Sequence, residues 1–254
     1  MDFYTLASSS GGNAALLRCG DTSILLDAGI SARRIRQALL RLGTSPEALS
    51  AVLVTHEHSD HVSGIATLTK QYGIPVYASR GTARFLRCPE PTLRVFDAGE
   101  GFTVGTMTVR SFRTSHDAAD SVDYRVDTAD GSFGALTDTG YVTNAAADAL
   151  AGVDLLLLEA NHDIDTLRAG PYPYHLKQRI LGQYGHLCNE AAAEFALYCA
   201  RQGTRDILLA HLSAENNSPD MAEYAVGRRL QGTAVRLAVA PKDRESEVHT
   251  ICKA

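Results

Sequence analysis

The chain has 254 residues, of which 45% are hydrophobic and 21% are charged, and its formal net charge is −5. This composition is typical of a globular protein, and the acidic balance excludes one that holds nucleic acid through a generally basic surface. Five widely spaced cysteines without a C-x-x-C motif do not indicate a disulfide framework. We see no secretory signal and no apolar run of membrane-spanning length, and therefore expect a cytoplasmic protein with no membrane partner.

Apolar runs bounded by turn residues predict strands that alternate with helices along most of the chain. The expected strands cover residues 3–7, 14–18, 23–27, 51–54, 74–78, 93–96, 154–159, 207–210 and 234–240, with several more between 102 and 136. The expected helices cover residues 31–42, 62–72, 80–87, 144–151, 173–182 and 189–202, with one more starting at Ser218-Pro219. Because strands are followed by helices in both halves, we expect two sheets packed together with helices outside, in a single domain of residues 1–254.

Local signals refine this expectation. Ser31 is a candidate helix cap, and Asn189 is expected to cap a helix that Gly203 ends. Asp130-Gly131 predicts a hairpin between two strands. The small residues at 8–13 fit a plain hairpin turn, and they equally fit a loop that contacts a phosphate, with Asn13 as the substrate contact.

The most informative stretch is Thr55-His56-Glu57-His58-Ser59-Asp60-His61, which follows the expected strand at 51–54. Imidazole and carboxylate groups are common ligands of zinc and related divalent metals. His56 and His58 can bind one ion from a turn, while Asp60 and His61 point elsewhere and can hold a second. The alternative is a solvated polar turn that happens to be rich in histidine, which leaves the preceding buried strand without a role.

Ligand-type side chains recur at the ends of other expected strands, at His116, Asp138, His162 and His211. Strand ends are rigid and can hold ligands within the small tolerance that a metal requires. Taken singly, His116 or His211 would more often be a surface or hydrogen-bonded histidine. Together with the histidine-rich loop, these residues predict a metal centre.

This ordered set of residues resembles the metallo-β-lactamase fold superfamily. The resemblance implies an α/β fold of four layers, an αββα sandwich, with a two-metal site at one edge. It implies that the first ion is held by His56, His58 and His116. The second ion would be held by Asp60, His61 and His211, and Asp138 would bridge the two. The implied cofactors are two divalent metal ions, Zn²⁺ or Mn²⁺.

Further motifs resemble the YycJ/WalJ subfamily, whose members are regarded as bacterial cytoplasmic nucleases with exonuclease action on DNA. The motifs are Ser8-Ser9-Ser10-Gly11-Gly12-Asn13, Leu158-Glu159-Ala160-Asn161-His162-Asp163, Gly170-Pro171-Tyr172-Pro173, Gly185-His186-Leu187 and His211-Leu212-Ser213-x-Glu215-Asn216-Asn217. They imply a metal-dependent phosphodiesterase of the 5′-to-3′ DNA exonuclease class, with a DNA end as its partner. The residues by themselves leave the polarity of cleavage open.

The resemblance also implies catalytic roles near the metals. His186 is similar to a catalytic histidine of related nucleases and is the candidate general acid, with metal or phosphate binding as the competing interpretation. Asp60 and His162 complete the expected catalytic set, although His162 could equally orient a metal ligand. Glu159 is expected to orient a nearby histidine.

Candidate substrate contacts lie just before residue 186. Lys177 and Arg179 could bind phosphates beyond the metals. Tyr172 and Tyr174 could stack on a terminal base, or they could simply pack a helix start against the core.

Two other functions fit the same residues. The first is hydrolysis of a small molecule, such as a cyclic phosphodiester, a thioester or a lactone, because a two-metal centre serves those reactions as well. The second is a non-catalytic binding protein, against which the complete set of ligands argues. The sequence leaves the native metal and the oligomeric state open.

Overall fold

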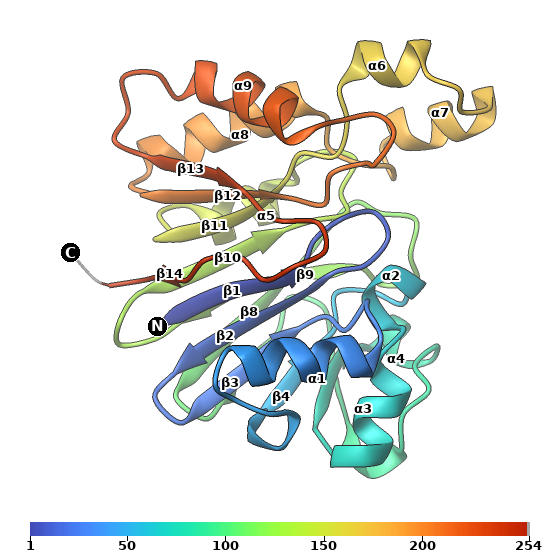
Figure 1. The fold of residues 1–254 in the computed structure, drawn as a ribbon, viewed down its shortest axis with the longest axis vertical. Coiled ribbons are helices and arrows are strands. Elements are labelled where there is room, and N and C mark those ends of the chain that lie inside the picture. The colour runs from blue at the N-terminus through green and yellow to red at the C-terminus, as the bar shows by residue number, and fades with distance from the viewer. Residues whose placement is uncertain (253–254) are drawn as a thin grey trace.

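Two seven-stranded sheets lie face to face in the computed structural model, which describes residues 1–252 (Figure 1). The first sheet has the order β14-β1-β2-β3-β4-β5-β6, with β14 at His249–Thr250, β1 at Asp2–Ala7, β2 at Ala14–Cys19, β3 at Thr22–Leu26, β4 at Ala51–Leu53, β5 at Val76–Ser79 and β6 at Leu93–Phe96. The second has the order β13-β12-β11-β10-β9-β8-β7, with β13 at Arg236–Val239, β12 at Asp206–Ala210, β11 at Leu155–Glu159, β10 at Ser132–Leu136, β9 at Val122–Asp127, β8 at Met107–Arg113 and β7 at Gly101–Val104.

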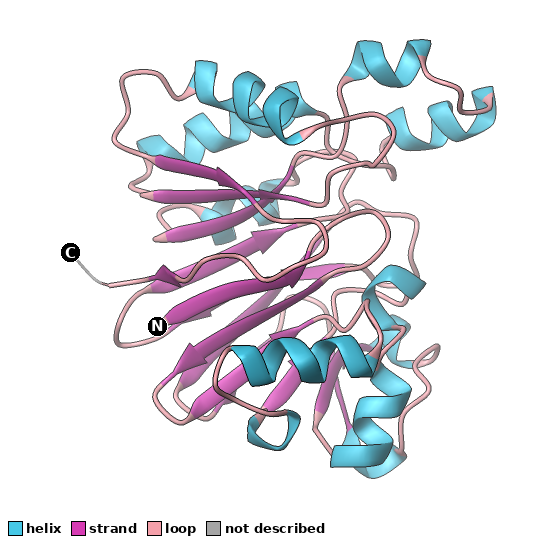
Figure 2. Cartoon of the chain, viewed as in Figure 1, coloured by secondary structure: helices cyan, strands magenta, loops and turns pink. Residues whose placement is uncertain are grey.

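Helices cover the outer faces of both sheets, so the fold is the αββα sandwich that the sequence predicts (Figure 2). Helices α1 and α3 pack on the first sheet, and α5, α8 and α9 pack on the second. The helices are α1 Ala32–Arg41, α2 Ser59–Val62, α3 Ile65–Tyr72, α4 Arg80–Ala83, α5 Asn144–Leu150, α6 Ile164–Ala169, α7 Tyr174–Leu181, α8 Asn189–Arg201 and α9 Pro219–Arg229.

Strand β11 is buried on both faces, which explains its continuous run of apolar residues. Leu155 and Leu157 contribute to the core between the two sheets, whereas Leu156 and Leu158 pack under the outer helices. Successive side chains of a strand point to opposite faces, so a strand buried on both faces needs apolar residues throughout.

Parallel strands in both sheets end at one edge of the molecule. Strands β3 to β6 are parallel in the first sheet, and β10 to β13 are parallel in the second. Strand β8 runs in the same direction as β10, because both are antiparallel to β9. The loops that follow these strands therefore meet at the same edge.

The local signals have mixed outcomes. Ser31 caps α1 as expected, and Asp130-Gly131 joins the antiparallel strands β9 and β10. The helix expected from Ser218-Pro219 is α9, with Ser218 as its cap. The Asn189 prediction is wrong, because Cys188 occupies the cap position of α8 while the Asn189 amide exchanges hydrogen bonds with Asn217.

Some boundaries also differ from the prediction. The helix expected at 62–72 begins only at Ile65, as α3, while Val62 ends a separate short helix, α2, and Gly64 lies between them. The backbone turns there because the Gly64 amide donates to the carbonyl of Ala28 instead of continuing a helix. Two elements, α6 and β14, carry no pattern that predicted them.

Candidate metal centre

All seven predicted metal ligands lie together at the edge where the parallel strands end. His56, His58, Asp60 and His61 follow β4, while the second sheet contributes His116 after β8, Asp138 after β10 and His211 after β12. Two halves of the chain thus supply one cluster, as the sequence pattern indicates.

The ligand atoms form overlapping groups within which all lie no more than 4.8 Å apart. Asp138 occurs in two of these groups, once with His56 and His61 and once with His186 and His211. Asp138 is thus shared between neighbouring groups of ligand atoms. The groups are His56/His58/His116, His56/His61/Asp138, Asp60/His61/His211 and Asp138/Glu159/His186/His211.

Three of the histidines are anchored through one ring nitrogen. Nδ1 of His61 lies 2.8 Å from Asp27 Oδ2, Nδ1 of His116 lies 3.1 Å from the Gly185 carbonyl oxygen, and Nδ1 of His211 lies 3.0 Å from Glu159 Oε1. Carboxylate and carbonyl oxygens only accept, so each Nδ1 carries a proton. Each Nε2 then points into the cluster and lies within 3.5 Å of an Asp138 carboxylate oxygen.

His56 tests whether these residues fit a metal. Its Nδ1 contacts the Thr55 hydroxyl at 3.0 Å, while its Nε2 is buried and has no hydrogen-bond partner within residues 1–252. A buried polar atom without a partner is costly in a folded protein. A divalent cation among these nitrogen and oxygen atoms removes that cost, and the donor set suits zinc or manganese.

Backbone strain is concentrated at the same place. Among the described residues other than glycine, only Asp27, Asp138 and His211 have positive φ angles, of 56°, 51° and 56°. Residues held in this left-handed region persist only where the surroundings enforce them, and they cluster at functional sites.

The charges at the centre balance one another. Burial raises the pKa of carboxyl groups, but the neighbouring imidazoles hold the pKa of Asp138 well below its usual range and that of Glu159 at about 2. Burial lowers the pKa of His211, yet Asp138, Asp60 and Glu159 raise that pKa to about 10. A cation that binds here replaces protons held by such histidines.

His186 borders a pocket of about 270 Å³ beside the ligands. Its Nδ1 lies 2.8 Å from Glu159 Oε1, so Glu159 contacts both His186 and His211. Burial lowers the pKa of His186, but the charge of Glu159 and its hydrogen bond outweigh this effect and raise that pKa above its ordinary value. The expectation that Glu159 orients a histidine agrees with these contacts.

His162 lies outside the cluster of ligand atoms. Its side chain is buried, and neither ring nitrogen has a hydrogen-bond partner among the described residues. Burial lowers the pKa of this histidine to about 4. It is therefore neutral at pH 7 and makes no hydrogen bond that would orient a metal ligand.

The predicted substrate contacts occupy different surroundings. Arg179 lines the pocket, and its Nε donates to Asp117 Oδ2 at 2.6 Å. Lys177 donates from Nζ to the carbonyl oxygens of Arg168 and Gly170, at 2.6 and 2.7 Å, and so fixes the turn before α7.

Asn13 lies against the metal ligands. Its Nδ2 is 3.2 Å from His61 Nε2, and its backbone amide donates to the Asp60 carbonyl at 2.8 Å. The amides of residues 9–12 also donate to partners within the protein. The loop at 8–13 is therefore a hairpin connection between β1 and β2 whose amides are already engaged.

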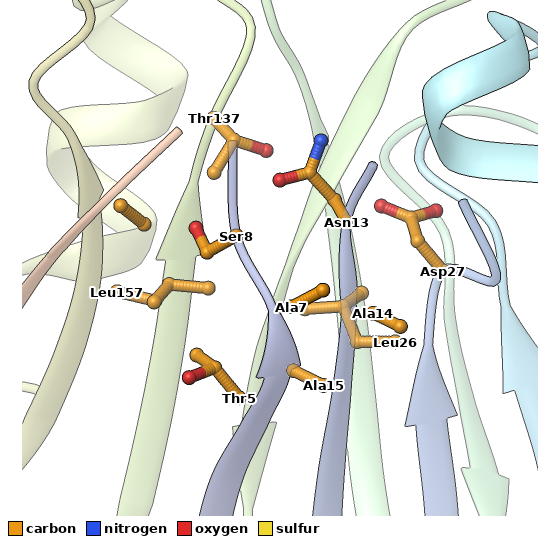
Figure 3. A pocket seen from close by; sticks show the side chains of 11 residues that line it. Thr5, Ala7, Ser8, Asn13, Ala14, Ala15, Leu26, Asp27, Thr137 and Leu157 are labelled. Atoms are coloured by element: carbon orange, nitrogen blue, oxygen red, sulfur yellow. The ribbon is translucent and has the colours of Figure 1, made fainter. Parts of the chain in front are cut away.

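A second, much smaller cavity lies between the sheets behind these ligands (Figure 3). Figure 3 shows Asn13, Asp27 and Thr137 at one end of it and apolar side chains such as Leu26 and Leu157 further in. Its volume of about 20 Å³ suits a water molecule and excludes a nucleotide.

Sequence reasoning missed Asp27 and Asp117. Asp27 holds both Thr55 and His61 through its two carboxylate oxygens, and it stands directly after β3. The strand-end position that identified the other ligands would have found it. Asp117 follows His116 and lies 3.4 Å from that residue's Nε2.

A model of the beta-lactamase superfamily domain matches residues 22–212 of this chain. Exodeoxyribonuclease WalJ of Streptococcus pneumoniae is 40% identical over 235 residues, which cover 90% of this chain and 87% of that protein. Exodeoxyribonuclease YycJ of Bacillus anthracis is 35% identical over 236 residues, which cover 91% of this chain and 89% of that protein. The chain belongs to the metallo-β-lactamase superfamily and, within it, to the group of the WalJ and YycJ proteins.

Solved structures share the fold at lower identity. The metallo-β-lactamase fold protein YhfI from Bacillus subtilis matches with a TM-score of 0.74 and 19% identity over 96% of this chain and 98% of that one. The short form of human tRNase Z matches with a TM-score of 0.69 and 20% identity over 99% of both chains. Within the described part of the chain, no helix has the length and apolar character needed to cross a membrane.

Proposed function

We propose that this protein is a two-metal DNA exonuclease. The observation that carries the proposal is the position of Asp138, whose carboxylate belongs to ligand groups on both sides of the centre. Two adjacent metal ions are the usual means of hydrolysing phosphodiesters. The two relatives of similar length are both named exodeoxyribonucleases, which supports DNA as the substrate.

The proposed ligand assignment follows the clusters. His56, His58 and His116 would hold one ion, Asp60, His61 and His211 would hold the other, and Asp138 would contact both. Zinc and manganese both suit these donors. Such ions, when bound, supply a nucleophile from water at neutral pH and stabilise charge on the phosphate oxygens.

We assign proton delivery to His186. Glu159 holds the Nδ1 side of the ring at 2.8 Å and raises the pKa of His186, which favours the protonated imidazole. A protonated imidazole beside the pocket can donate to the leaving oxygen of the cleaved strand. His162 suits this role less well, because its lowered pKa of about 4 leaves it neutral.

Substrate positioning rests mainly on Arg179, since its side chain lines the pocket and is 56% exposed. Asn13 and Lys177 stay predictions as substrate contacts. A DNA strand would have to compete for groups that already bond to His61 and Asp60 or to Arg168 and Gly170.

The test is incubation of the purified protein with end-labelled DNA in Mn²⁺ or Zn²⁺, beside bis-p-nitrophenyl phosphate and a thioester. We expect progressive shortening of the DNA, and labels on opposite ends report whether cleavage runs 5′ to 3′. Asp138→Asn should remove activity together with bound metal. His186→Ala should keep its metal and lower turnover by about 10²–10⁴-fold.

His249→Ala is the matched control, because His249 lies on β14 and away from the centre. Cleavage of the small esters without any DNA shortening would instead identify a small-molecule hydrolase. Loss of metal from His186→Ala would contradict its assignment as the proton donor.

A further inference from the structure

Tyrosines stand around the mouth of the pocket beside the metal centre. Tyr172 and Tyr184 line it together with Arg179 and His186. Tyr184 is 62% exposed and Tyr172 is half-buried. Both come from the segment around α7, which lies on the same side of the molecule as α2, on the right in Figure 1.

The pocket offers little positive charge of its own. Arg179 is its only lysine or arginine among the described residues, and its Nε already pairs with Asp117. The ammonium group of Lys177, on the same helix, already donates hydrogen bonds to two backbone carbonyl oxygens. Beyond Arg179, protein contacts to the strand must therefore come from uncharged groups, and aromatic faces supply such contacts to nucleic-acid bases.

Tyr184 is held in a fixed relation to the metal ligands. The next residue, Gly185, accepts from His116 Nδ1 through its carbonyl oxygen, and the preceding Gln183 accepts from the Ser115 hydroxyl at 2.8 Å. A side chain at Gly140 would lie only 2.2 Å from the Gln183 oxygen, so two loops meet closely there. The exposed ring thus has a backbone fastened on both sides.

We propose that Tyr184 is a stacking platform for the terminal, unpaired base of a DNA strand whose phosphate reaches Arg179 and the metal centre. This inference rests on the proposed exonuclease function and names the form of its substrate. At about 270 Å³ the pocket lies just below the range for small-ligand sites, about 300–1,000 Å³, so its size is closer to one nucleotide than to a base pair. The enzyme therefore prefers a strand with an unpaired end over a blunt duplex.

The test removes the stacking contact between Tyr184 and the terminal base, once by changing the DNA and once by changing the protein. The intact protein is given oligonucleotides that end in a normal unpaired nucleotide or in an abasic one, and kcat/KM is measured. Loss of one stacked base is worth about 1–3 kcal/mol, so the abasic end should lower kcat/KM about 5- to 150-fold. Tyr184→Ala should show the same loss on the normal end and no further loss on the abasic end.

Two variants separate stacking from a merely structural effect. Tyr184→Phe keeps the ring and should retain the wild-type ratio between the two ends. Tyr224→Ala removes a tyrosine of similar exposure, 66%, from α9 and should leave both rates unchanged. A second readout needs no catalysis: fluorescence of a terminal 2-aminopurine should be quenched by the chelator-treated full chain and not by Tyr184→Ala.

Different results would contradict the stacking role of Tyr184 and the exonuclease function. If the wild-type protein shortens normal and abasic ends equally well, or if Tyr184→Ala slows both equally, the platform is wrong while the exonuclease stands. If the metal-loaded wild type shortens no DNA and gives no 2-aminopurine quenching, both proposals are wrong.

Discussion

Two buried carboxylates hold the histidines of the metal centre. Asp27 contacts His61 and the Thr55 hydroxyl, and Glu159 contacts His186 and His211. Glu159 also accepts two backbone amides through its other oxygen, which fixes its position. At the residue scale, the orientation of the ligands is thus set by groups that need not touch a metal themselves.

Asp27→Asn should weaken metal binding without unfolding the protein. Asparagine tolerates the positive φ of 56° at this position, but it lacks the charge that keeps the proton on His61 Nδ1. Loss of such a supporting group typically lowers metal affinity by about 10–100-fold. Titration against a chromophoric chelator measures this affinity, and Asp21→Asn in the exposed β2–β3 turn is the control. Equal affinity in both variants would contradict the role given to Asp27.

The candidate ligands and Glu159 could be singled out from the sequence, whereas the contact between Asp27 and His61 could not. Each ligand follows an apolar run, so its place at a strand end can be predicted from the sequence. Asp27 and His61 are separated by 34 positions, and they meet only because β3 pairs in parallel with β4. The cap assigned to Asn189 was wrong for a similar reason, since Asn217 from a distant loop engages its amide.

At the scale of elements, the loop after β3 supports the loop that carries the histidines. Its backbone amides at Ala28 and Gly29 donate to the carbonyls of His61 and Asn13, and the Asn13 amide donates to Asp60. A Cβ at Gly29 would lie 1.6 Å from the Asp60 carbonyl oxygen. The two loops can approach this closely only because residue 29 has no side chain.

Gly29→Ala should therefore displace the metal loop. Overpacking of this kind costs about 1–3 kcal/mol and occasionally more, and we expect lower Tm together with reduced metal content. Gly227→Ala in helix α9 is the matched control. A Cβ at Gly227 would have Leu237 Cδ2, at 3.6 Å, as its nearest neighbour, which is ordinary van der Waals contact. That change should raise stability by about 0.5–1 kcal/mol. An unchanged Tm and metal content in Gly29→Ala would show that the loops separate freely.

At the scale of the whole molecule, the sequence predicted the layers of sheets and helices, but it did not predict the order of the strands within each sheet. Periodicity identifies buried strands such as Leu155–Glu159, and their alternation with helices predicts two covered sheets. It does not predict β14, since two residues carry no pattern and Thr250 pairs with Asp2 at the other end of the chain. Pairing across such a distance is set by packing, which local sequence does not record.

The centre also joins the two sheets. The edge of the first sheet carries His56, His58, Asp60 and His61, and the edge of the second carries His116, Asp138 and His211. Bound ions would therefore tie both halves together.

A ligand at 100 times its Kd stabilises a fold by about 2.7 kcal/mol, which for a protein of this size is a Tm shift of about 5–11 °C. Chelation should lower Tm by this amount, and added Zn²⁺ or Mn²⁺ should restore it. In Asp138→Asn, the difference in Tm between metal-loaded and chelator-treated protein should be much smaller. In Asp148→Asn, which changes an exposed residue of α5, this difference should stay the same. If Tm is the same with and without metal in the wild-type protein, the ions do not hold the sheets together, and the sandwich must be stable through its apolar core alone.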